Sequence, residues 1–322
     1  MYKLLFTISI IFLFNACSQL SHNEALSKKC ILESLRIEQH NTFCSAPRSA
    51  LLDDNYLYIG FDDGLIAQWD LDSNKLVRKF EQNDFFSIQQ LIKYENKIYA
   101  ASKSMKLKKF SLNGNIEQEK NYEKGSLFCL ENTNNFIYAG FGNTELGVIN
   151  LNSLELDDVK QEHQYLIYSL YKEKQQLLSG GDDNRLVVWN IDTNGSLNKE
   201  KSIDNFSSSI RKITKYRSST ILGLGDGTLI QLDNNFNQHL YKSNSQNFPI
   251  TALIATKEHL VSGDSSGQVI IWEESSKRLK TIAEYKLDST IKLIIEHNNS
   301  YLFFTKKGFI QKITHKQITT KG

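Results

Sequence analysis

Histidine, serine and aspartate side chains occur near one another in the middle of the sequence, in an order that could build a nucleophilic site. His163 is followed by Ser179 and by the acidic pair Asp182 and Asp183. A serine activated by a histidine that a carboxylate orients is the arrangement of a hydrolase triad. That chemistry also needs a sharp nucleophile turn, and no G-x-S-x-G segment surrounds Ser179. We therefore expect these residues to have a structural role and the protein not to be an enzyme.

Metal and cofactor patterns are missing from the sequence. No two histidines have the H-x-x-x-H spacing and no two cysteines have the C-x-x-C spacing, with which a short segment supplies two ligands. The segment Gly223–Gly227 resembles a phosphate loop, but such a loop needs a following helix, and none is predicted. We expect no metal and no cofactor. The remaining histidines are expected at the surface: His22, His40, His239, His259, His297 and His315.

Composition describes a globular chain with little excess charge. The 322 residues are 40% hydrophobic, and 38 basic residues against 36 acidic ones give a net charge of +2. A chain of this hydrophobicity can bury a sizeable core, and it lacks the positive excess typical of nucleic-acid-binding proteins. Only two prolines occur, and no low-complexity linker divides the sequence, so we expect one compact body.

The first residues have the features of an export signal. Lys3 precedes an apolar stretch, Leu4 to Phe14, which is too short to span a bilayer but suits a signal peptide over residues 1–16. The following segment, from Phe14 to Cys17, resembles a bacterial lipobox, in which the cysteine is acylated. The resemblance implies a lipoprotein anchored to a membrane through Cys17, facing the periplasm or the cell exterior, with residues 17–33 as a tether. A plain bacterial signal peptide, or a eukaryotic one, is the alternative.

The rest of the chain repeats one block seven times. Each block ends near a large apolar anchor residue: Trp69, Phe110, Ile149, Trp189, Leu232, Trp272 and Ile313. Successive anchors are 41, 39, 40, 43, 40 and 41 residues apart, close to the period of a four-stranded propeller blade. The period predicts an all-β fold, a seven-bladed β-propeller with four-stranded antiparallel blades.

Three further positions repeat with the anchors. Twenty-two residues before them, six of the seven residues are aliphatic and should begin the first strand of each blade: Pro47, Ile88, Leu127, Ile167, Ile210, Ile250 and Ile291. Nine residues before them, small residues indicate close contact with a neighbouring blade: Gly60, Ala101, Gly140, Gly180, Gly223 and Gly263, with Phe304 as the exception. Five residues before them, Gly64, Asn184, Gly227, Gly267 and Gly308 predict hairpin turns.

The fourth block resembles a repeat of the WD-repeat family. In that family a histidine, a serine, an aspartate and a tryptophan form a buried hydrogen-bonded tetrad. The resemblance places His163, Ser179, Asp182 or Asp183, and Trp189 in these roles. The resemblance to the family extends over about residues 46–322, but the other blocks retain fewer residues of the tetrad. The interval from the first-strand residue to the tryptophan is about two residues shorter than is usual for the family, which implies a tight first hairpin turn.

The offsets of the repeat also predict how the ring closes. After the last anchor only Thr319 to Gly322 remain for an outer strand, whereas counting back from Pro47 reaches Ser34. Leu35 and Ile37 alternate with polar residues as in a strand. We expect residues 34–39 to complete the last blade, so that the propeller occupies residues 34–322.

The cysteines beyond Cys17 are expected to be structural or free. Export would permit a disulfide between Cys30 and Cys44, but a strand of about 20 Å between them disfavours a bond that requires Cα atoms within about 7 Å. Cys129 follows a first-strand position and is expected in the core.

The repeat architecture favours a binding function. We expect a monomeric propeller that acts as a protein-protein interaction scaffold or assembly factor and binds a protein partner. Its candidate binding residues are aromatic and lie two to four residues before a first strand: Phe85, Phe86, Tyr165, Phe206 and Phe248. Packing beneath neighbouring loops is the alternative for each.

Two other functions stay open. Exported propellers include accessory proteins of periplasmic respiratory enzymes such as nitrate reductase, and the resemblance allows such a role. A propeller enzyme or small-ligand receptor would instead use the central channel, with inward carboxylates, histidines or a stacking tryptophan. The three tryptophans of this chain occupy anchor positions.

Overall fold

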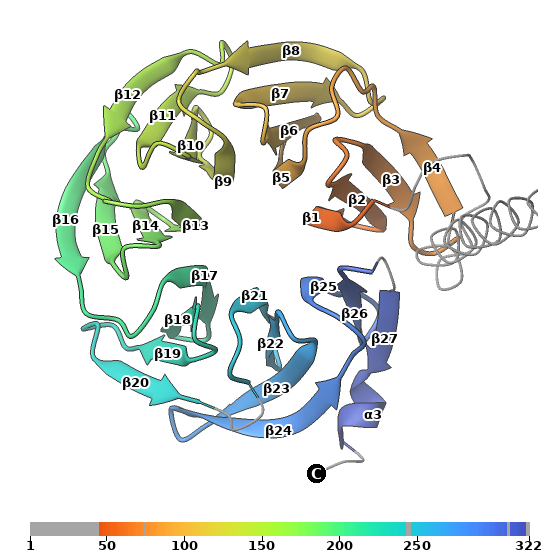
Figure 1. Cartoon of the computed structure of the whole chain (residues 1–322), viewed down its shortest axis with the longest axis vertical. Helices are drawn as coiled ribbons and strands as arrows, with labels where there is room; N and C mark the ends of the chain where they lie inside the picture. Colours follow the sequence, from red (N-terminus) through yellow and green to blue (C-terminus); the bar gives the residue numbers. More distant parts are fainter. Residues whose placement is uncertain (1–44, 74, 243–245, 308–309, 320–322) are drawn as a thin grey trace, which may run out of the picture.

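Seven small β-sheets are arranged in a ring around a central axis (Figure 1). The structure, a computed structural model, describes residues 45–73, 75–242, 246–307 and 310–319. Nearly all of these residues are in strands and tight turns, which confirms the all-β, seven-bladed propeller predicted from the repeat. The first strand of each blade lies nearest the axis, and the fourth strands lie at the circumference of the ring (Figure 1).

The first four blades are antiparallel sheets whose strands follow one another in sequence. Blade 1 contains β1 (Pro47–Asp53), β2 (Tyr56–Phe61), β3 (Ile66–Asp70) and β4 (Lys75–Lys79). Blade 2 contains β5 (Ile88–Tyr94), β6 (Lys97–Ser102), β7 (Lys106–Ser111) and β8 (Ile116–Asn121). Blade 3 contains β9 (Leu127–Asn132), β10 (Phe136–Phe141), β11 (Leu146–Asn150) and β12 (Leu156–Lys160). Blade 4 contains β13 (Ile167–Glu173), β14 (Gln176–Gly181), β15 (Leu186–Ile191) and β16 (Leu197–Ile203).

The last three blades continue the same order. Blade 5 contains β17 (Ile210–Tyr216), β18 (Ser219–Leu224), β19 (Leu229–Leu232) and β20 (Gln238–Tyr241). Blade 6 contains β21 (Ile250–Ala255), β22 (Leu260–Asp264), β23 (Gln268–Ser275) and β24 (Arg278–Lys286). Blade 7 contains β25 (Ile291–Glu296), β26 (Ser300–Thr305) and β27 (Ile310–Thr314), which the short helix α3 (His315–Thr319) follows.

The predicted strand starts agree with the structure in every blade. The seven residues found 22 positions before the anchors are the first residues of the seven innermost strands. Two-residue turns join the first and second strands in blades 1, 2, 4 and 5, which confirms the expected tight turn. The repeat therefore predicts strand register as well as strand number.

The turn between the second and third strands needs a left-handed residue. Five positions before the anchor, φ is +87° at Gly64, +58° at Asn184, +85° at Gly227 and +93° at Gly267, as predicted. Blades 2 and 3 place Met105 and Thr144 at the same position, with φ of +67° and +79°. A side chain with a Cβ is strained in this region, and a β-branched one most of all. Thr144 therefore carries local backbone strain that glycine would relieve.

Neighbouring blades contact one another through pairs of small and large residues. A Cβ built on Gly60, Gly180, Gly223 or Gly263 would lie 2.4 to 2.6 Å from the Cγ2 atom of the isoleucine that begins the next blade. Gly140 faces Ile167 in the same way, with 3.1 Å to its Cβ. Blade 2 has Ala101 instead, and the next blade begins with Leu127, which has no branch at Cβ. Alanine, which is larger than glycine, thus faces leucine, which leaves more room than isoleucine because it is not branched at Cβ.

The junction between blade 7 and blade 1 reverses this pairing. Phe304 occupies the position of the glycines and is fully buried, while the first strand of blade 1 begins with Pro47 in place of isoleucine. Phe304, Leu302 and Ile310 form one apolar cluster with residues of blade 1, including Trp69. Both exceptions of the repeat therefore fall at the junction that closes the ring.

Several predicted features fall outside the described residues. The closing strand at residues 34–39, the signal peptide, the tether, Cys17, Cys30 and Cys44 all lie in the segment 1–44, and blade 7 has three strands in the part that the structure describes. Within the described residues, no helix is long and apolar enough to cross a membrane. Cys129 is buried, and burial raises the pKa of its thiol to about 12, so it is a core residue and not a reactive thiol.

Candidate protein-binding face

Three of the residues that suggested a catalytic triad form one buried network with Trp189 in blade 4. Nδ1 of His163 lies 3.0 Å from both carboxylate oxygens of Asp183, and Nε2 lies 2.8 Å from Oγ of Ser179. Nε1 of Trp189 donates to the same Oγ at 2.8 Å. Ser179 is fully buried and His163 is 3% exposed. The serine hydroxyl is held between two side chains and has no room for a substrate.

The network fixes the loop that precedes blade 4. His163 and Gln164 belong to that loop, and Asp183, in the turn between β14 and β15, binds both: the His163 ring and the backbone N–H of Gln164, at 3.0 Å. Burial opposes ionisation of Asp183, but the His163 hydrogen bond and the further donors hold its pKa below the ordinary value. Asp182 points elsewhere, toward Arg211 at 3.5 Å. Asp183 is therefore the aspartate of the network.

Blade 6 contains a variant of this network that the sequence did not suggest. Oγ of Ser262 donates to Oε1 of Gln246 at 3.1 Å and accepts from Nε1 of Trp272 at 2.9 Å. Gln246 precedes Ser262 by 16 positions, as His163 precedes Ser179. This offset was the available signal. It was missed because glutamine was not considered as a replacement for histidine.

Blade 2 holds the equivalent loop with an ion pair. Nζ of Lys108 lies 2.7 Å from Oδ2 of Asp84, and the lysine is only 2% exposed. Asp84 also accepts from the backbone N–H of Phe86 at 3.2 Å. Burial would raise the pKa of Asp84, but the hydrogen bond from Lys108 lowers it below its usual value. The carboxylate therefore stays charged and holds the loop beside Phe86.

These two hydrogen-bond networks and the ion pair lie at the same sequence distance from the first strand of their blades, and they determine which side chains of the loop face solvent. Asp84, His163 and Gln246 each lie four residues before a first strand and point inward. Phe206 occupies the same position in blade 5, where it is 5% exposed and packs in the apolar core. Its assignment as a binding residue was therefore wrong, because its position faces the blade.

The aromatic residues two and three positions before a first strand point outward. Phe86, Tyr165 and Phe248 are 54%, 60% and 53% exposed, and Phe85 is 81% exposed. In blades 1, 3, 5 and 7 the position two before the strand holds Ser45, Gly125, Ser208 and Ser289. Large aromatic and small residues therefore alternate around one face of the ring. We call Phe85, Phe86, Tyr165 and Phe248 the aromatic rim.

Exposed apolar side chains are concentrated on this face. The described residues include eight large apolar side chains that are exposed. The aromatic rim supplies four of them, and Met105 belongs to a turn between second and third strands, which antiparallel connectivity places on the same face. Only Tyr56, Val77 and Leu240 lie on the opposite face or on outer strands.

Glycine turns of the preceding blades fix the backbone of the rim. A Cβ on Gly64 would lie 2.9 Å from the carbonyl oxygen of Phe86, and one on Gly227 would lie 3.0 Å from that of Phe248. The carbonyls of Phe86 and Phe248 thus pack on a glycine that leaves room for them. The side chains of Phe86 and Phe248 therefore project from a backbone that packs against the turn of the preceding blade.

Basic residues begin several of the inner strands beside the rim. Each first strand has a register irregularity at its second residue, and all seven residues there are half-buried: Arg48, Gln89, Phe128, Tyr168, Arg211, Thr251 and Lys292. The Arg211 guanidinium lies over the Tyr168 ring at 4.0 Å, and Phe128 packs edge-on against that ring. None of these seven described residues is a carboxylate, a histidine or a tryptophan, the residue types that were expected of a site in the central channel.

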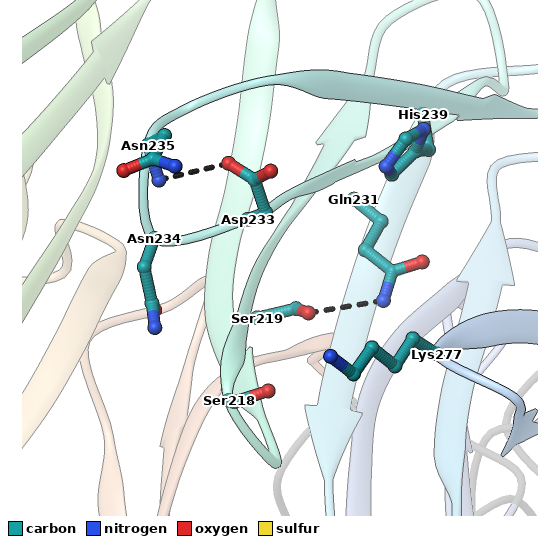
Figure 2. A pocket seen from close by; sticks show the side chains of 8 residues that line it. All are labelled: Ser218, Ser219, Gln231, Asp233, Asn234, Asn235, His239 and Lys277. Atoms are coloured by element: carbon teal, nitrogen blue, oxygen red, sulfur yellow. Dashed lines mark hydrogen bonds between the residues drawn. The ribbon is translucent and has the colours of Figure 1, made fainter.

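A polar pocket on the opposite face is lined mainly by residues of blade 5 (Figure 2). Asp233 accepts from the backbone of Asn235 and Asn237 and so closes its own turn. Gln231 donates to Ser219 at 3.0 Å and accepts from Tyr241 at 2.8 Å. Two of the lining side chains, Asp233 and Gln231, therefore bond within the fold itself.

Comparison with known proteins supports the fold. No model of a protein family matches the sequence, and no curated protein matches it. A crystal structure of the computationally designed Ika8 protein is 19% identical, with a TM-score of 0.65, over 86% of this chain and 98% of its own. A chain in a crystal structure of the mitotic checkpoint complex is 13% identical, with a TM-score of 0.70, over 85% of this chain and 93% of its own. At these identities the similarity shows the propeller fold alone.

Proposed function

We propose that this protein is a non-enzymatic interaction scaffold that binds a protein partner on the face carrying the aromatic rim. The observation that carries the proposal is the placement of exposed aromatic side chains at one repeat position in blades 2, 4 and 6, with small residues between them. Exposed aromatic residues on a soluble surface mark binding sites when they cluster. Here five of the eight large apolar side chains that are exposed in the described part of the chain share one face.

The rim is suited to tight binding because its loops are already ordered. Aromatic side chains supply large contact areas and have few rotatable bonds, so they dominate binding energy in many interfaces. The buried networks at Asp84, His163 and Gln246 hold the loop backbone before a partner arrives. Binding then loses little loop entropy.

The charge near the rim favours an acidic partner segment. Arg48, Arg211 and Lys292 each lie three residues after a rim position, at the start of an inner strand. Burial, and then the nearby positive charge of Arg48, lower the pKa of Lys292. A carboxylate placed there would relieve this repulsion. Arg48 and Arg211 already pair with Asp62 at 3.3 Å and with Asp182 at 3.5 Å. We therefore expect a partner segment that combines apolar side chains for the rim with Asp or Glu for Lys292.

The cellular setting belongs to the same proposal. The apolar stretch before Cys17 supports export, and acylation of Cys17 would anchor the protein to a membrane, since each buried methylene contributes about 0.8 kcal/mol. Membership of the WD-repeat family is supported by the network of blade 4. The propeller would remain in the aqueous phase with the rim available to partners.

Site-specific photo-crosslinking tests the proposed face. A photoreactive phenylalanine analogue is placed at Phe86, Tyr165 or Phe248 in the full-length protein in its own cells. Matched controls carry it at Tyr56, Val77 or Leu240, which are 41%, 41% and 65% exposed and lie off the rim. The proposal expects one and the same protein to be crosslinked from the three rim positions and not from the controls. Equal crosslinking from both sets would contradict it.

A further inference from the structure

Three potential metal ligands from two blades meet at the face opposite the aromatic rim. Glu258 and His259 lie in the turn between β21 and β22 of blade 6, and His315 begins α3 after the last strand of blade 7. One ligand atom from each lies within 4.8 Å of the others. Nδ1 of His315 is 3.5 Å from Oε2 of Glu258. The two histidines are 56 residues apart in sequence, so no local motif could indicate this cluster.

Each imidazole has another polar group near its second nitrogen. The hydroxyl of Tyr301 lies 2.9 Å from Nδ1 of His259, which leaves Nε2 of that ring available. Tyr301 is fully buried, and its hydroxyl also lies 3.3 Å from Oγ1 of Thr256. Oε1 of Glu296 lies 3.3 Å from Nε2 of His315. Histidines that bind a metal through one nitrogen commonly have the other oriented by a hydroxyl, carbonyl or carboxylate.

The surroundings allow an ion to enter and compensate its charge. Glu258 is 65% exposed at its side chain and His315 17%, so the cluster is open on one side. A groove lined by Asn298, Asn299, Lys312 and Lys316 runs past Glu258 and His315. The two lysines oppose a bound cation, but the carboxylates of Glu258 and Glu296 offset their charge. Water from the groove can fill an open coordination position.

We propose that Glu258, His259 and His315 bind one zinc ion, with Glu296 and Tyr301 orienting the two histidines. Two imidazoles and one carboxylate with a fourth position open to water are a ligand set that zinc accepts. The ion would connect the β21–β22 turn of blade 6 to the end of blade 7. It would thereby stabilise the blade that has three strands in the described part of the chain.

Isothermal titration of the full-length protein with zinc chloride tests the site. We expect one equivalent of zinc that is lost in the His259→Ala/His315→Ala double variant and retained in His239→Ala, a control in blade 5. Because Glu258 is largely exposed, Glu258→Gln should fold normally and weaken binding. Tyr301→Phe should weaken it by roughly 10- to 100-fold, as expected for a group that orients a ligand.

Thermal unfolding supplies a second measurement. Zinc should raise the melting temperature of the wild type and of His239→Ala, and should raise that of Glu258→Gln by less at the same zinc concentration, because binding only to the folded state stabilises it by an amount that increases with affinity. An unchanged zinc equivalent in the double variant would overturn the proposal. So would a wild type whose melting temperature does not respond to zinc, which would reduce the cluster to ion pairs between His315 and its two glutamates.

Discussion

Substitution of Gly180 by alanine tests whether the blades are held together by steric pairing of small and large residues. Gly180 does not have a positive φ, so the alanine backbone is allowed. Its Cβ would lie 2.4 Å from Cγ2 and 2.9 Å from Cβ of Ile210 in blade 5. Both distances are far shorter than van der Waals contact, and the isoleucine is fully buried.

The magnitude follows from the cost of overpacking a core. Inserting one methyl group into a well-packed site typically costs about 1–3 kcal/mol. Replacing glycine by alanine at a compatible site would instead stabilise by about 0.4–1 kcal/mol through the unfolded chain. A measured loss of stability is therefore a lower limit for the steric cost at this contact. In a domain of this size, each kcal/mol shifts the melting temperature by roughly 2 °C.

The natural pair of Ala101 and Leu127 suggests the compensating change. Ile210→Leu moves the branch from Cβ to Cγ at constant volume, which should cost less than about 1.5 kcal/mol alone. Combined with Gly180→Ala, it recreates the Ala101–Leu127 pair two junctions further along the ring. We expect the double variant to be more stable than Gly180→Ala, with a coupling energy of about 0.5–3 kcal/mol.

Urea unfolding of the wild type, the two single variants and the double variant measures this coupling. Two results would refute the reasoning. One is a Gly180→Ala protein as stable as the wild type. The other is a pair of substitutions whose effects simply add, since independent effects would mean that the two side chains do not compete for the same space.

Four further outcomes are expected. Thr144→Gly should stabilise by about 1 kcal/mol because it relieves a positive φ in a β-branched residue, whereas Asn184→Gly, measured by the same urea unfolding, should be nearly neutral. His163→Ala should lower the melting temperature and reduce crosslinking from position 165 but not from position 248. The control variant His239→Ala should change neither the melting temperature nor the crosslinking. Burial raises the pKa of Glu131 to about 7, so its contribution to stability is present below pH 4.5 and is lost as the pH rises through 7. Glu131→Gln should therefore melt at a higher temperature than the wild type at pH 8 and at the same temperature at pH 4. Equal melting temperatures at pH 8 would contradict the raised pKa of Glu131. A palmitate analogue should label the wild type and not Cys17→Ala, and an unlabelled wild type would disprove the lipid anchor.

Much of the fold could be predicted because each blade repeats the same local physical requirements. Apolar residues at fixed offsets identified the start of all seven first strands, and small residues identified the contacts between blades. The turn position was visible where it held glycine or asparagine. It was hidden at Met105 and Thr144, because there the tertiary structure imposes a conformation that the residue itself disfavours.

The binding face was predictable only in part. Sequence offsets located the loops of the rim, but they did not separate residues four positions before a strand, which point inward, from those two or three before it, which point outward. Phe206 was misassigned for this reason. The cluster of Glu258, His259 and His315 could not be predicted, since its members come from different blades and meet only after the ring has formed.

The exceptional residues Phe304 and Pro47 distinguish the junction between blade 7 and blade 1 from the other six. If blade 7 were left out, Gly263 of blade 6 would meet Pro47, and two small residues would leave an unfilled space at the seam. If blade 1 were left out, Phe304 would meet Ile88, and two large residues would compete for one site. The exceptional residues at positions 47 and 304 therefore favour closure of blade 7 on blade 1 over a ring that lacks either of these two blades.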